Sequence, residues 1–308
     1  KQKHVLEGFY HDTLGERDRA QATDRIRTFV RGLFDDPPQR IDLRSADHGG
    51  HTFDEAQALA KPLPWYTPRG AYWALTRAGL KLGGLLSHGI RLGHRTGFDS
   101  GSTLDYVYRN RAQGLPLLGT FVDRTYLDSI GWRGIRVRKT HVEALLADGF
   151  TRERAQGLPL RVMDIAAGHG RYVLDVIAGS AATPEARPES ILLRDYSDIN
   201  VRDGAALIAE RGLQDIARFV RADAFDRDDL AAVTPPPTVT VVSGLYELFA
   251  DNAMVARSLE GIAAAMPAGA CLVYTGQPWH PQLELIARAL TSHRQGQAWG
   301  MRRRTPAG

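Results

Sequence analysis

The chain has 308 residues and a formal net charge of +4, with 43% hydrophobic and 24% charged residues. This composition excludes global disorder, because it supplies enough apolar side chains for a sizeable core, and at about 150 residues per domain the length predicts roughly two domains. Cys271 is the single cysteine, so an internal disulfide and a cysteine-based zinc site are excluded and a cytoplasmic protein is expected.

Charge and hydropathy also bear on the choice of partner. The basic excess is too small to indicate nucleic-acid binding by itself, since arginine and aspartate are interspersed along most of the chain. The longest uncharged stretch, from Gly261 to Leu283, contains Pro267, Pro278 and Pro281, which would break a membrane-spanning helix. We therefore expect no nucleic-acid partner and no transmembrane segment.

Residues 1–34 form the first predicted segment. The run from His4 to Asp12 predicts a short strand that ends at a turn. The apolar spacing from Arg17 to Leu33 then predicts a helix, which Pro37 and Pro38 would end.

Residues 35–115 are predicted to be a linker that carries one basic amphipathic helix. Three prolines between Lys61 and Arg69 keep the first part extended, apart from a short helix near Phe53 to Leu59. We interpret a loose histidine and aspartate cluster at the start of this segment as linker and predict no metal site. The cluster consists of Asp47, His48, His51 and Asp54.

The basic helix is expected from Ala71 to Leu92. Helical spacing places its cations on one stripe beside several leucines, and no acid occurs between Glu55 and Asp99. One interpretation is peripheral contact with an anionic membrane through residues 71–97. The alternative is a helix packed on its neighbour with a solvated basic face, which the glycines of this stretch favour.

The remaining chain predicts a helical cover over residues 116–159, helix-like from Leu117 to Phe150, and then an α/β domain over 160–308. Short apolar runs alternate there with helical segments, which predicts a doubly wound parallel sheet of the Rossmann-like type with an N-terminal helical extension. The five predicted strands are Arg161–Ile165, Ser190–Asp195, Ala217–Arg221, Val239–Ser243 and Ala270–Tyr274.

The loop after the first strand has the pattern of a nucleoside-binding turn. Ala166, Gly168 and Gly170 are small enough to let a ligand approach the backbone closely. A dinucleotide fold would want a third small residue where Val173 stands and has no use for an acid at Asp164. A carboxylate at that strand end suits a cationic ligand, and S-adenosylmethionine carries a sulfonium and an ammonium group.

Two further acids end the second and third strands. Asp195 is placed to accept hydrogen bonds from both ribose hydroxyls, and Asp223 to accept one from the adenine amino group. The alternative for Asp195 is a helix cap or a surface charge. In an open parallel sheet, the carboxyl ends of the strands meet at one edge, so these acids are expected to face one ligand.

This pattern resembles the class I S-adenosylmethionine-dependent methyltransferases, over Leu160 to about Leu290. The resemblance implies cofactor contacts from Asp164, Ala166, Gly168, Gly170, Asp195 and Asp223. Ala166 stands where the family usually has its first glycine. The family also ends with two antiparallel strands that the sequence after Leu290 does not supply, so a truncated domain is predicted.

The loop after the fourth strand faces the methyl acceptor in that family. Tyr246 and Glu247 are therefore the predicted catalytic residues, with Glu247 as general base or as a structural hydrogen-bond partner. Methyl transfer is an in-line displacement that positioning alone can accelerate, so no base is required. The acceptor is expected to be a small molecule, with a lipid or another hydrophobic compound favoured.

The segment Gly8-Phe9-Tyr10-His11-Asp12 resembles the C-terminal end of a lipase-type α/β-hydrolase, in which His11 would be the triad histidine. No Gly-x-Ser-x-Gly elbow occurs in the chain, so His11 has no serine to activate. Together with the absence of a starting methionine, this resemblance predicts the second half of a bacterial hydrolase–methyltransferase fusion family, with residues 1–34 as the hydrolase remnant.

Two other functions stay open at this point. An NAD(P)-dependent oxidoreductase can use a similar sheet, and Val173 argues against it. A non-catalytic module could instead use its basic helix to dock on lipid or on a partner protein. The oligomeric state is not predicted.

Overall fold

The computed structural model describes residues 5–10, 12–35, 51–180, 187–294 and 299–304. The chain divides into two compact units, Lys1–Leu43 and Arg44–Gly308. The first unit contains α1 (Arg19–Asp35), which confirms the helix predicted from Arg17 to Leu33.

The predicted strand at the start of the chain is wrong for the residues that the structure describes. Residues 5–10 contain a turn at Glu7 and Gly8 and no strand, because Gly8 takes a φ of 79°, which directs the backbone out of the extended conformation. His11, the residue of the hydrolase-like motif, lies outside the described residues.

The second unit is built on a parallel sheet of five strands, formed by the described residues in the order β3-β2-β1-β4-β5. This confirms the predicted Rossmann-like α/β fold, and each strand begins and ends within one residue of its predicted bounds. Buried parallel strands are short apolar runs, which explains the agreement. The strands are β1 (Arg161–Ile165), β2 (Ser190–Asp195), β3 (Ala217–Arg221), β4 (Val239–Val242) and β5 (Cys271–Tyr274).

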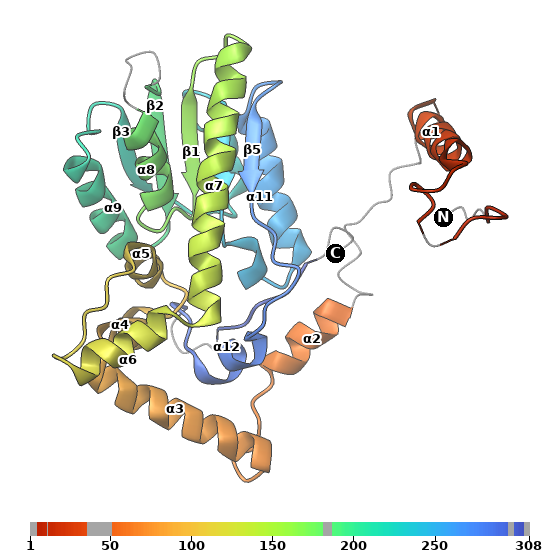
Figure 1. The fold of residues 1–308 in the computed structure, drawn as a ribbon. Coiled ribbons are helices and arrows are strands. Elements are labelled where there is room, and N and C mark those ends of the chain that lie inside the picture. Colours follow the sequence, from red (N-terminus) through yellow and green to blue (C-terminus); the bar gives the residue numbers. More distant parts are fainter. Residues whose placement is uncertain (1–4, 11, 36–50, 181–186, 295–298, 305–308) are drawn as a thin grey trace. The chain divides into compact units, whose positions relative to one another are not determined.

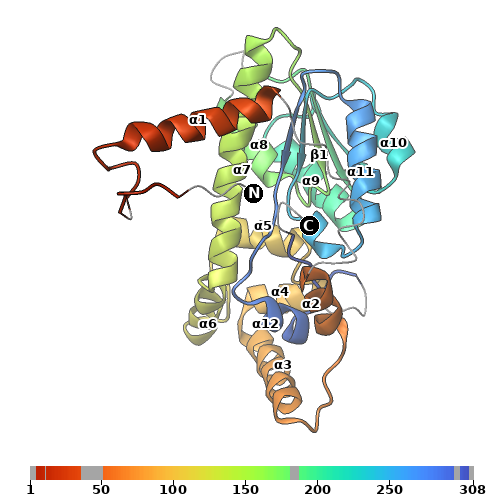
Figure 2. The same cartoon turned by 90° about the vertical axis from the view of Figure 1, so that its right-hand side faces the viewer.

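Helices cover both faces of the sheet, as Figure 2 shows. One face carries α7, α8 and α9, whose apolar residues join one core cluster, and the other carries α10 and α11, which join a second. The bounds are α7 (Ile130–Ala155), α8 (Arg171–Ser180), α9 (Asp198–Glu210), α10 (Arg227–Ala231) and α11 (Asn252–Ala265).

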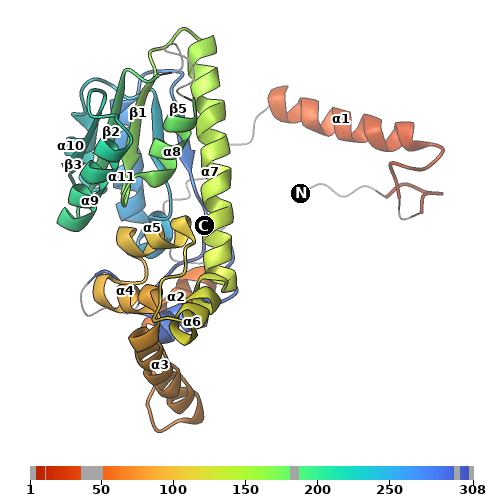
Figure 3. The ribbon, with the colours of Figure 1, turned by 60° about the vertical axis from the view of Figure 1, so that its left-hand side comes forward.

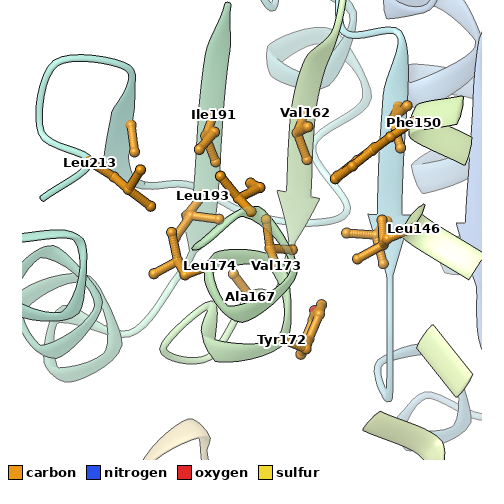
Figure 4. Packing of buried hydrophobic residues seen from close by; sticks show 14 of the residues in the cluster. Leu146, Phe150, Val162, Ala167, Tyr172, Val173, Leu174, Ile191, Leu193 and Leu213 are labelled. Atoms are coloured by element: carbon orange, nitrogen blue, oxygen red, sulfur yellow. The ribbon is translucent and has the colours of Figure 1, made fainter. Parts of the chain in front are cut away.

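The core between the sheet and α7–α9 holds the strands in place. Figure 4 shows Val173 and Leu174 of α8 facing Val162 and Leu193 of the sheet. All four side chains are buried, and full burial of such a side chain stabilises the fold by about 1.5–3 kcal/mol. This packing fixes the turn between β1 and α8, which is the predicted nucleoside-binding loop.

The segment predicted as a linker is largely helical. After the predicted short helix, which is confirmed within α2, the chain forms further helices that pack near the carboxyl ends of the strands (Figure 1). The predicted helical cover is α6 followed by α7, with a break at Asp128 and Ser129. The bounds are α2 (His51–Ala60), α3 (Pro68–Leu86), α4 (His88–Thr96), α5 (Gly101–Arg109) and α6 (Leu118–Leu127).

The single helix predicted from Ala71 to Leu92 is wrong, because the chain breaks at Ser87 between α3 and α4. Ser87 adopts an extended conformation and caps α4 by accepting a hydrogen bond from the backbone N–H of Ile90 at 3.1 Å. Its own hydroxyl donates to the buried carboxylate of Asp123 on α6. The break therefore depends on a partner distant in the sequence.

After β5 the described chain forms α12 (Leu283–Ala289) and no further strand, and the segment 299–304 returns to the end of β4. Arg302 donates its backbone N–H to the Glu247 carbonyl at 2.7 Å, and Arg304 donates to the Phe249 carbonyl at 2.6 Å. This segment thus holds the loop after β4 through the backbone carbonyls of that loop. None of the described helices is both long and apolar enough to cross a bilayer.

Candidate active site

A cleft of about 980 Å³ lies at the carboxyl ends of β1 to β4. The strand order reverses between β1 and β4, and ligands of open parallel sheets bind at such a switch point. The helix α5 lies across these strand ends in Figures 1 and 3 and lines the cleft from the other side. The sheet and the helical part of this unit therefore share the cleft.

The turn after β1 needs small residues for its backbone. Ala166, Gly168 and Gly170 all have positive φ angles, of 55°, 59° and 72°. A Cβ atom at Gly170 would lie 2.4 Å from a methyl carbon of Leu193, so only glycine fits there. Ala166 occupies a left-handed conformation that costs a non-glycine residue about 1–2 kcal/mol. The predicted tolerance of alanine at this place thus has an energetic cost.

Gly168 is also the point at which the helical part touches the loop. A Cβ atom on Gly101, the first residue of α5, would lie 2.7 Å from the Gly168 Cα atom and 2.5 Å from the Asn200 side-chain oxygen. Ser100 caps α5 by accepting from the Thr103 N–H at 3.2 Å, which sets where the helix begins. The start of α5 and the glycine loop are therefore in backbone contact.

Asp195, at the end of β2, lines the cleft and is buried. Its Oδ2 accepts from the Gly168 N–H at 3.0 Å, and its Oδ1 accepts from the Ser197 N–H at 2.9 Å and from the Asn200 amide at 3.0 Å. Burial raises the pKa of Asp195, although these three hydrogen bonds oppose the shift. The carboxylate is thus fixed in direction and joined to the glycine loop.

Asp164 is placed differently from the other predicted acids. It is fully buried in β1, and the cleft lining found in the described chain does not include it. Its Oδ1 accepts from the Tyr172 hydroxyl at 2.7 Å, while burial raises its pKa well above the usual carboxyl value. Asp164 is therefore not placed to contact a ligand in the cleft directly, whereas its partner Tyr172 lines that space.

Asp223 lies at the outer end of the cleft, where it is exposed. Its Oδ1 accepts from the Phe225 N–H at 2.9 Å, which turns the chain so that Phe225 meets Phe249 edge to face at 4.5 Å. The Arg294 guanidinium lies 5.2 Å from the centre of the Phe249 ring. Two aromatic side chains next to an acid are suited to packing against a purine ring.

Two buried acids of the helical part, which sequence analysis did not identify as site residues, also line the cleft. Asp105 on α5 pairs with Arg171, the first residue of α8, and with Arg109 at 3.0 Å. Burial alone would raise the pKa of Asp105, but hydrogen bonds from His169 and Arg171 lower it to about 2. This ion-pair cluster ties α5 to the glycine loop and to α8.

Asp99 precedes α5 and accepts from the Ser292 hydroxyl at 2.6 Å and from the His293 backbone N–H at 2.5 Å, and the His293 Nδ1 lies 3.0 Å from the carboxylate. Burial would raise the pKa of Asp99, but the His293 contacts outweigh it and hold this pKa below its usual value. The partners are almost 200 residues apart, so no local motif indicates the pair. The only sequence signal is the run Asp99-Ser100-Gly101, which has the composition of a helix start.

A second cavity, of about 410 Å³, adjoins the cleft and is mostly apolar. Asp99, Leu104, Gly244 and Leu248 line both spaces. Deeper in, the rings of Trp132 and Trp299 stack at 6.1 Å. The two spaces therefore meet at the end of β4, where a polar cleft changes into an aromatic cavity.

The two predicted catalytic residues have different surroundings. Glu247 lines the apolar cavity and pairs with Arg138 on α7 at 3.2 Å. Tyr246 is buried, lies outside both cavity linings found in the described chain, and has its hydroxyl 3.0 Å from Ser258 on α11. Burial raises the pKa of Tyr246 to about 12. Of this pair, only Glu247 is in reach of a molecule in the cavity.

Two other features of the described residues do not compete with this site. A hollow of about 310 Å³ lies at the amino-terminal ends of β1 to β3, which is the wrong edge of a parallel sheet for a ligand. No group of three or more histidine, cysteine or acidic residues is placed to hold a metal ion in the described ranges.

Comparison with known proteins gives the family. The profile of a family described as "Putative methyltransferase" matches residues 26–308. The uncharacterized protein YnbC of Escherichia coli K12 is 49% identical over 306 residues, which are 99% of this chain and 51% of that protein. The chain thus spans about half the length of this curated relative.

Solved structures give a likeness of fold. A possible exported protein from Bordetella parapertussis matches with a TM-score of 0.54 and 17% identity, covering 86% of each chain. A SAM-dependent methyltransferase from Geobacter sulfurreducens, in complex with S-adenosyl-L-homocysteine, matches with a TM-score of 0.34 and 19% identity, covering 47% of this chain and 49% of that one. At 17% identity the Bordetella likeness shows the fold alone, and the TM-score of the Geobacter match is too low to support an argument.

Proposed function

The chain belongs to this methyltransferase family, and we propose that it transfers a methyl group from S-adenosylmethionine to a hydrophobic small molecule. The observation that carries the proposal is the cleft at the switch point of the sheet, in which the glycine loop and Asp195 are joined by a hydrogen bond. When bound, S-adenosylmethionine supplies a methyl carbon activated by its sulfonium group.

Asp195 is the residue we assign to the ribose. An ionised carboxylate has about four acceptor positions, and donors in the described chain use three of them. Oδ2 accepts only the Gly168 N–H among these, so it can take a ribose hydroxyl. The expected contact is thus one hydroxyl on Oδ2, which is narrower than the sequence prediction of hydrogen bonds from both ribose hydroxyls.

The other predicted cofactor residues receive more limited roles. Gly168 and Gly170 allow the close backbone approach that a nucleoside needs, and Ala166 begins the same turn. Asp223 and its neighbouring phenylalanines suit the adenine side. Asp164 would act from within the sheet, through Tyr172, rather than by direct contact with the cofactor.

Asp99 supplies the negative charge at the place where transfer would occur. It lines the polar cleft and the apolar cavity, and its lowered pKa keeps it ionised at neutral pH. A carboxylate there favours the approach of a sulfonium group, and a fixed position for both reactants accelerates an in-line displacement.

The apolar cavity supports the choice of acceptor. Its aromatic lining offers burial to an apolar molecule, and it opens to the cleft beside Gly244. Glu247 reaches this space, so we assign to it the acceptance of a proton from an acceptor hydroxyl or amine, while Arg138 balances its charge. We assign Tyr246 a structural role, because its hydrogen bond with Ser258 attaches the loop after β4 to α11.

Calorimetric titration of the 308-residue chain tests the proposal. S-adenosylmethionine should bind at one site, and Asp195→Ala should weaken binding by about 1–3 kcal/mol, because the ribose loses a charged hydrogen-bond partner. Asp215→Ala is the matched control, since Asp215 is an exposed acid paired with Arg187 away from the cleft. Absence of S-adenosylmethionine binding, or binding of NAD or NADP in its place, would contradict the proposal and favour the oxidoreductase alternative.

Two finer predictions stay predictions. The hydrolase–methyltransferase fusion agrees with a relative about twice as long as this chain, but His11 is outside the described residues. A cytoplasmic location also stays a prediction, and its basis is the single cysteine.

A further inference from the structure

We propose that one face of the helical part docks on an anionic lipid bilayer, and that the hydrophobic acceptor enters the apolar cavity from there. The entry step rests on the proposed function, while the docking step does not. The docking face is defined by outward-pointing side chains of α3 and α6, namely Tyr72, Leu75, Leu82, Leu85, Leu118 and Phe121.

These six side chains are unusually open for large apolar residues, since each is 60% to 73% exposed. Their spacing on α3 puts four of them on one side of that helix. The opposite side is fastened to α12, because Trp73 donates its ring N–H to Glu284 at 3.2 Å and Arg77 donates to the Arg288 carbonyl at 2.8 Å. The helix is therefore held with its apolar side outward.

The two helices form one surface. The Leu115 N–H donates to the Leu86 carbonyl at 3.0 Å, and a Cβ atom on Gly119 would lie 2.6 Å from that same carbonyl oxygen. Figures 1 and 3 both show α3 beside α6 on the side of this unit away from the sheet. An apolar surface that continues from one element to the next is typical of an interaction site.

Charge indicates what covers this surface. Between residues 56 and 127 the sequence has only three acids, and all three are buried: Asp99, Asp105 and Asp123. The exposed charges of this stretch are therefore cationic, and Lys81 and Arg91 are among them. A second copy of the chain would bring the same positive charge against this face, whereas an anionic bilayer complements it.

The docking face adjoins the apolar cavity. Phe121 belongs to the face and also lines the cavity, and Leu80 of α3 lines the cavity beside it. The same cavity reaches the cofactor cleft at Gly244 and Leu248. An apolar path thus runs from the proposed membrane side to the place of methyl transfer.

The face differs from the membrane contact predicted from the sequence, which covered residues 71–97. Ile90 and Leu92 of α4 are buried, so α4 contributes no apolar side chain to the surface. The chain around Leu118 and Phe121, which the sequence pattern assigned to a helical cover, contributes instead.

Flotation of the 308-residue chain with vesicles tests the docking step. Vesicles of phosphatidylcholine mixed equally with phosphatidylglycerol should carry the protein upward, pure phosphatidylcholine should carry less, and high salt should release it. The double variant Leu75→Asp, Leu82→Asp should weaken binding by roughly tenfold or more, since two apolar side chains no longer enter the interface. Leu145→Asp, an exposed leucine of α7, is the control that should bind unchanged.

Circular dichroism and S-adenosylmethionine titration of the same variants separate the possible failures. Neither substituted leucine lines the cleft or the apolar cavity, so cofactor binding should be unchanged. If the wild-type chain fails to bind anionic vesicles at low salt, or if the double variant binds equally well, the docking proposal is wrong. A dimer in sedimentation that the double variant abolishes would also overturn it, by assigning the face to a second copy. Vesicle binding without cofactor binding would contradict only the proposed function.

Discussion

The proposed cofactor cleft has two walls whose origins in the sequence differ. The wall of strand-end loops is encoded locally, since the glycine turn follows β1 directly and Asp195 is the last residue of β2. The wall formed by α5 depends on partners far along the chain, as in the contact of Asp99 with Ser292. Short sequence motifs therefore reveal the part of a site that a parallel sheet forms, but they do not reveal the part that a covering helix forms.

Breaking the contact between the walls should have the largest effect. Gly101→Ala puts a Cβ atom against Gly168, so we expect the variant to lose about 1–3 kcal/mol of stability and to bind S-adenosylmethionine roughly tenfold or more weakly. Thermal unfolding and titration measure both. Gly134→Ala is the control, because a Cβ atom there meets nothing within 4 Å. Equal behaviour of the two variants would show that the walls do not meet as described.

The ion pairs that join α5 to the glycine loop give a pH-dependent test. The pKa of Asp105 is about 2, below the ordinary 3.8, so its charge contributes stability that is present above pH 3.8 and is lost as the pH falls toward 2. The pH-dependent contribution is about 2 kcal/mol.

Asp105→Asn removes this contribution, so its deficit in unfolding free energy against the wild-type chain should shrink as the pH falls from 4 to 2. Denaturant unfolding at several pH values measures it. Asp215→Asn, which alters an exposed ion pair, should show a much smaller pH dependence. A deficit of Asp105→Asn that stays constant down to pH 2 would argue against the pairing.

The smallest expected effect concerns only the wall formed by the strand-end loops. Ala166→Gly relieves a left-handed alanine worth about 1–2 kcal/mol, partly offset by the greater freedom of glycine in the unfolded chain, so a net gain of up to about 1 kcal/mol is expected. A rise in Tm checks it. Ala178→Gly, at an exposed position of α8, should lower Tm instead. If both variants lose stability alike, Ala166 is not strained.

The same contrast explains which predictions from the sequence succeeded. The strands and the turn at Gly168 were predictable because local composition determines them. The break at Ser87 was not predictable, because a serine within a helical pattern does not by itself begin a new helix. Here Ser87 caps α4 because its hydroxyl is bound to the carboxylate of Asp123 on another helix. The linker-like sequence pattern likewise gave no sign of α5, whose position depends on backbone contact with Gly168.

Acids were the least predictable part of the site. Asp164 has the position expected from its motif, yet it is fully buried and bonded to Tyr172, because the same strand must also fill the core. Asp99 and Asp105 line the cleft without any local motif. The residue type thus indicated neither burial nor orientation, which depend on packing that spacing alone does not express.

The most direct test of the shared cleft is a crystal structure of the chain with S-adenosyl-L-homocysteine. We predict that the ribose lies within hydrogen-bond distance of the Asp195 carboxylate and that the ligand is enclosed between the glycine loop and the start of α5, at Ser100 and Gly101. A ligand bound only by the strand-end loops with α5 displaced, or bound elsewhere in the molecule, would contradict the shared cleft.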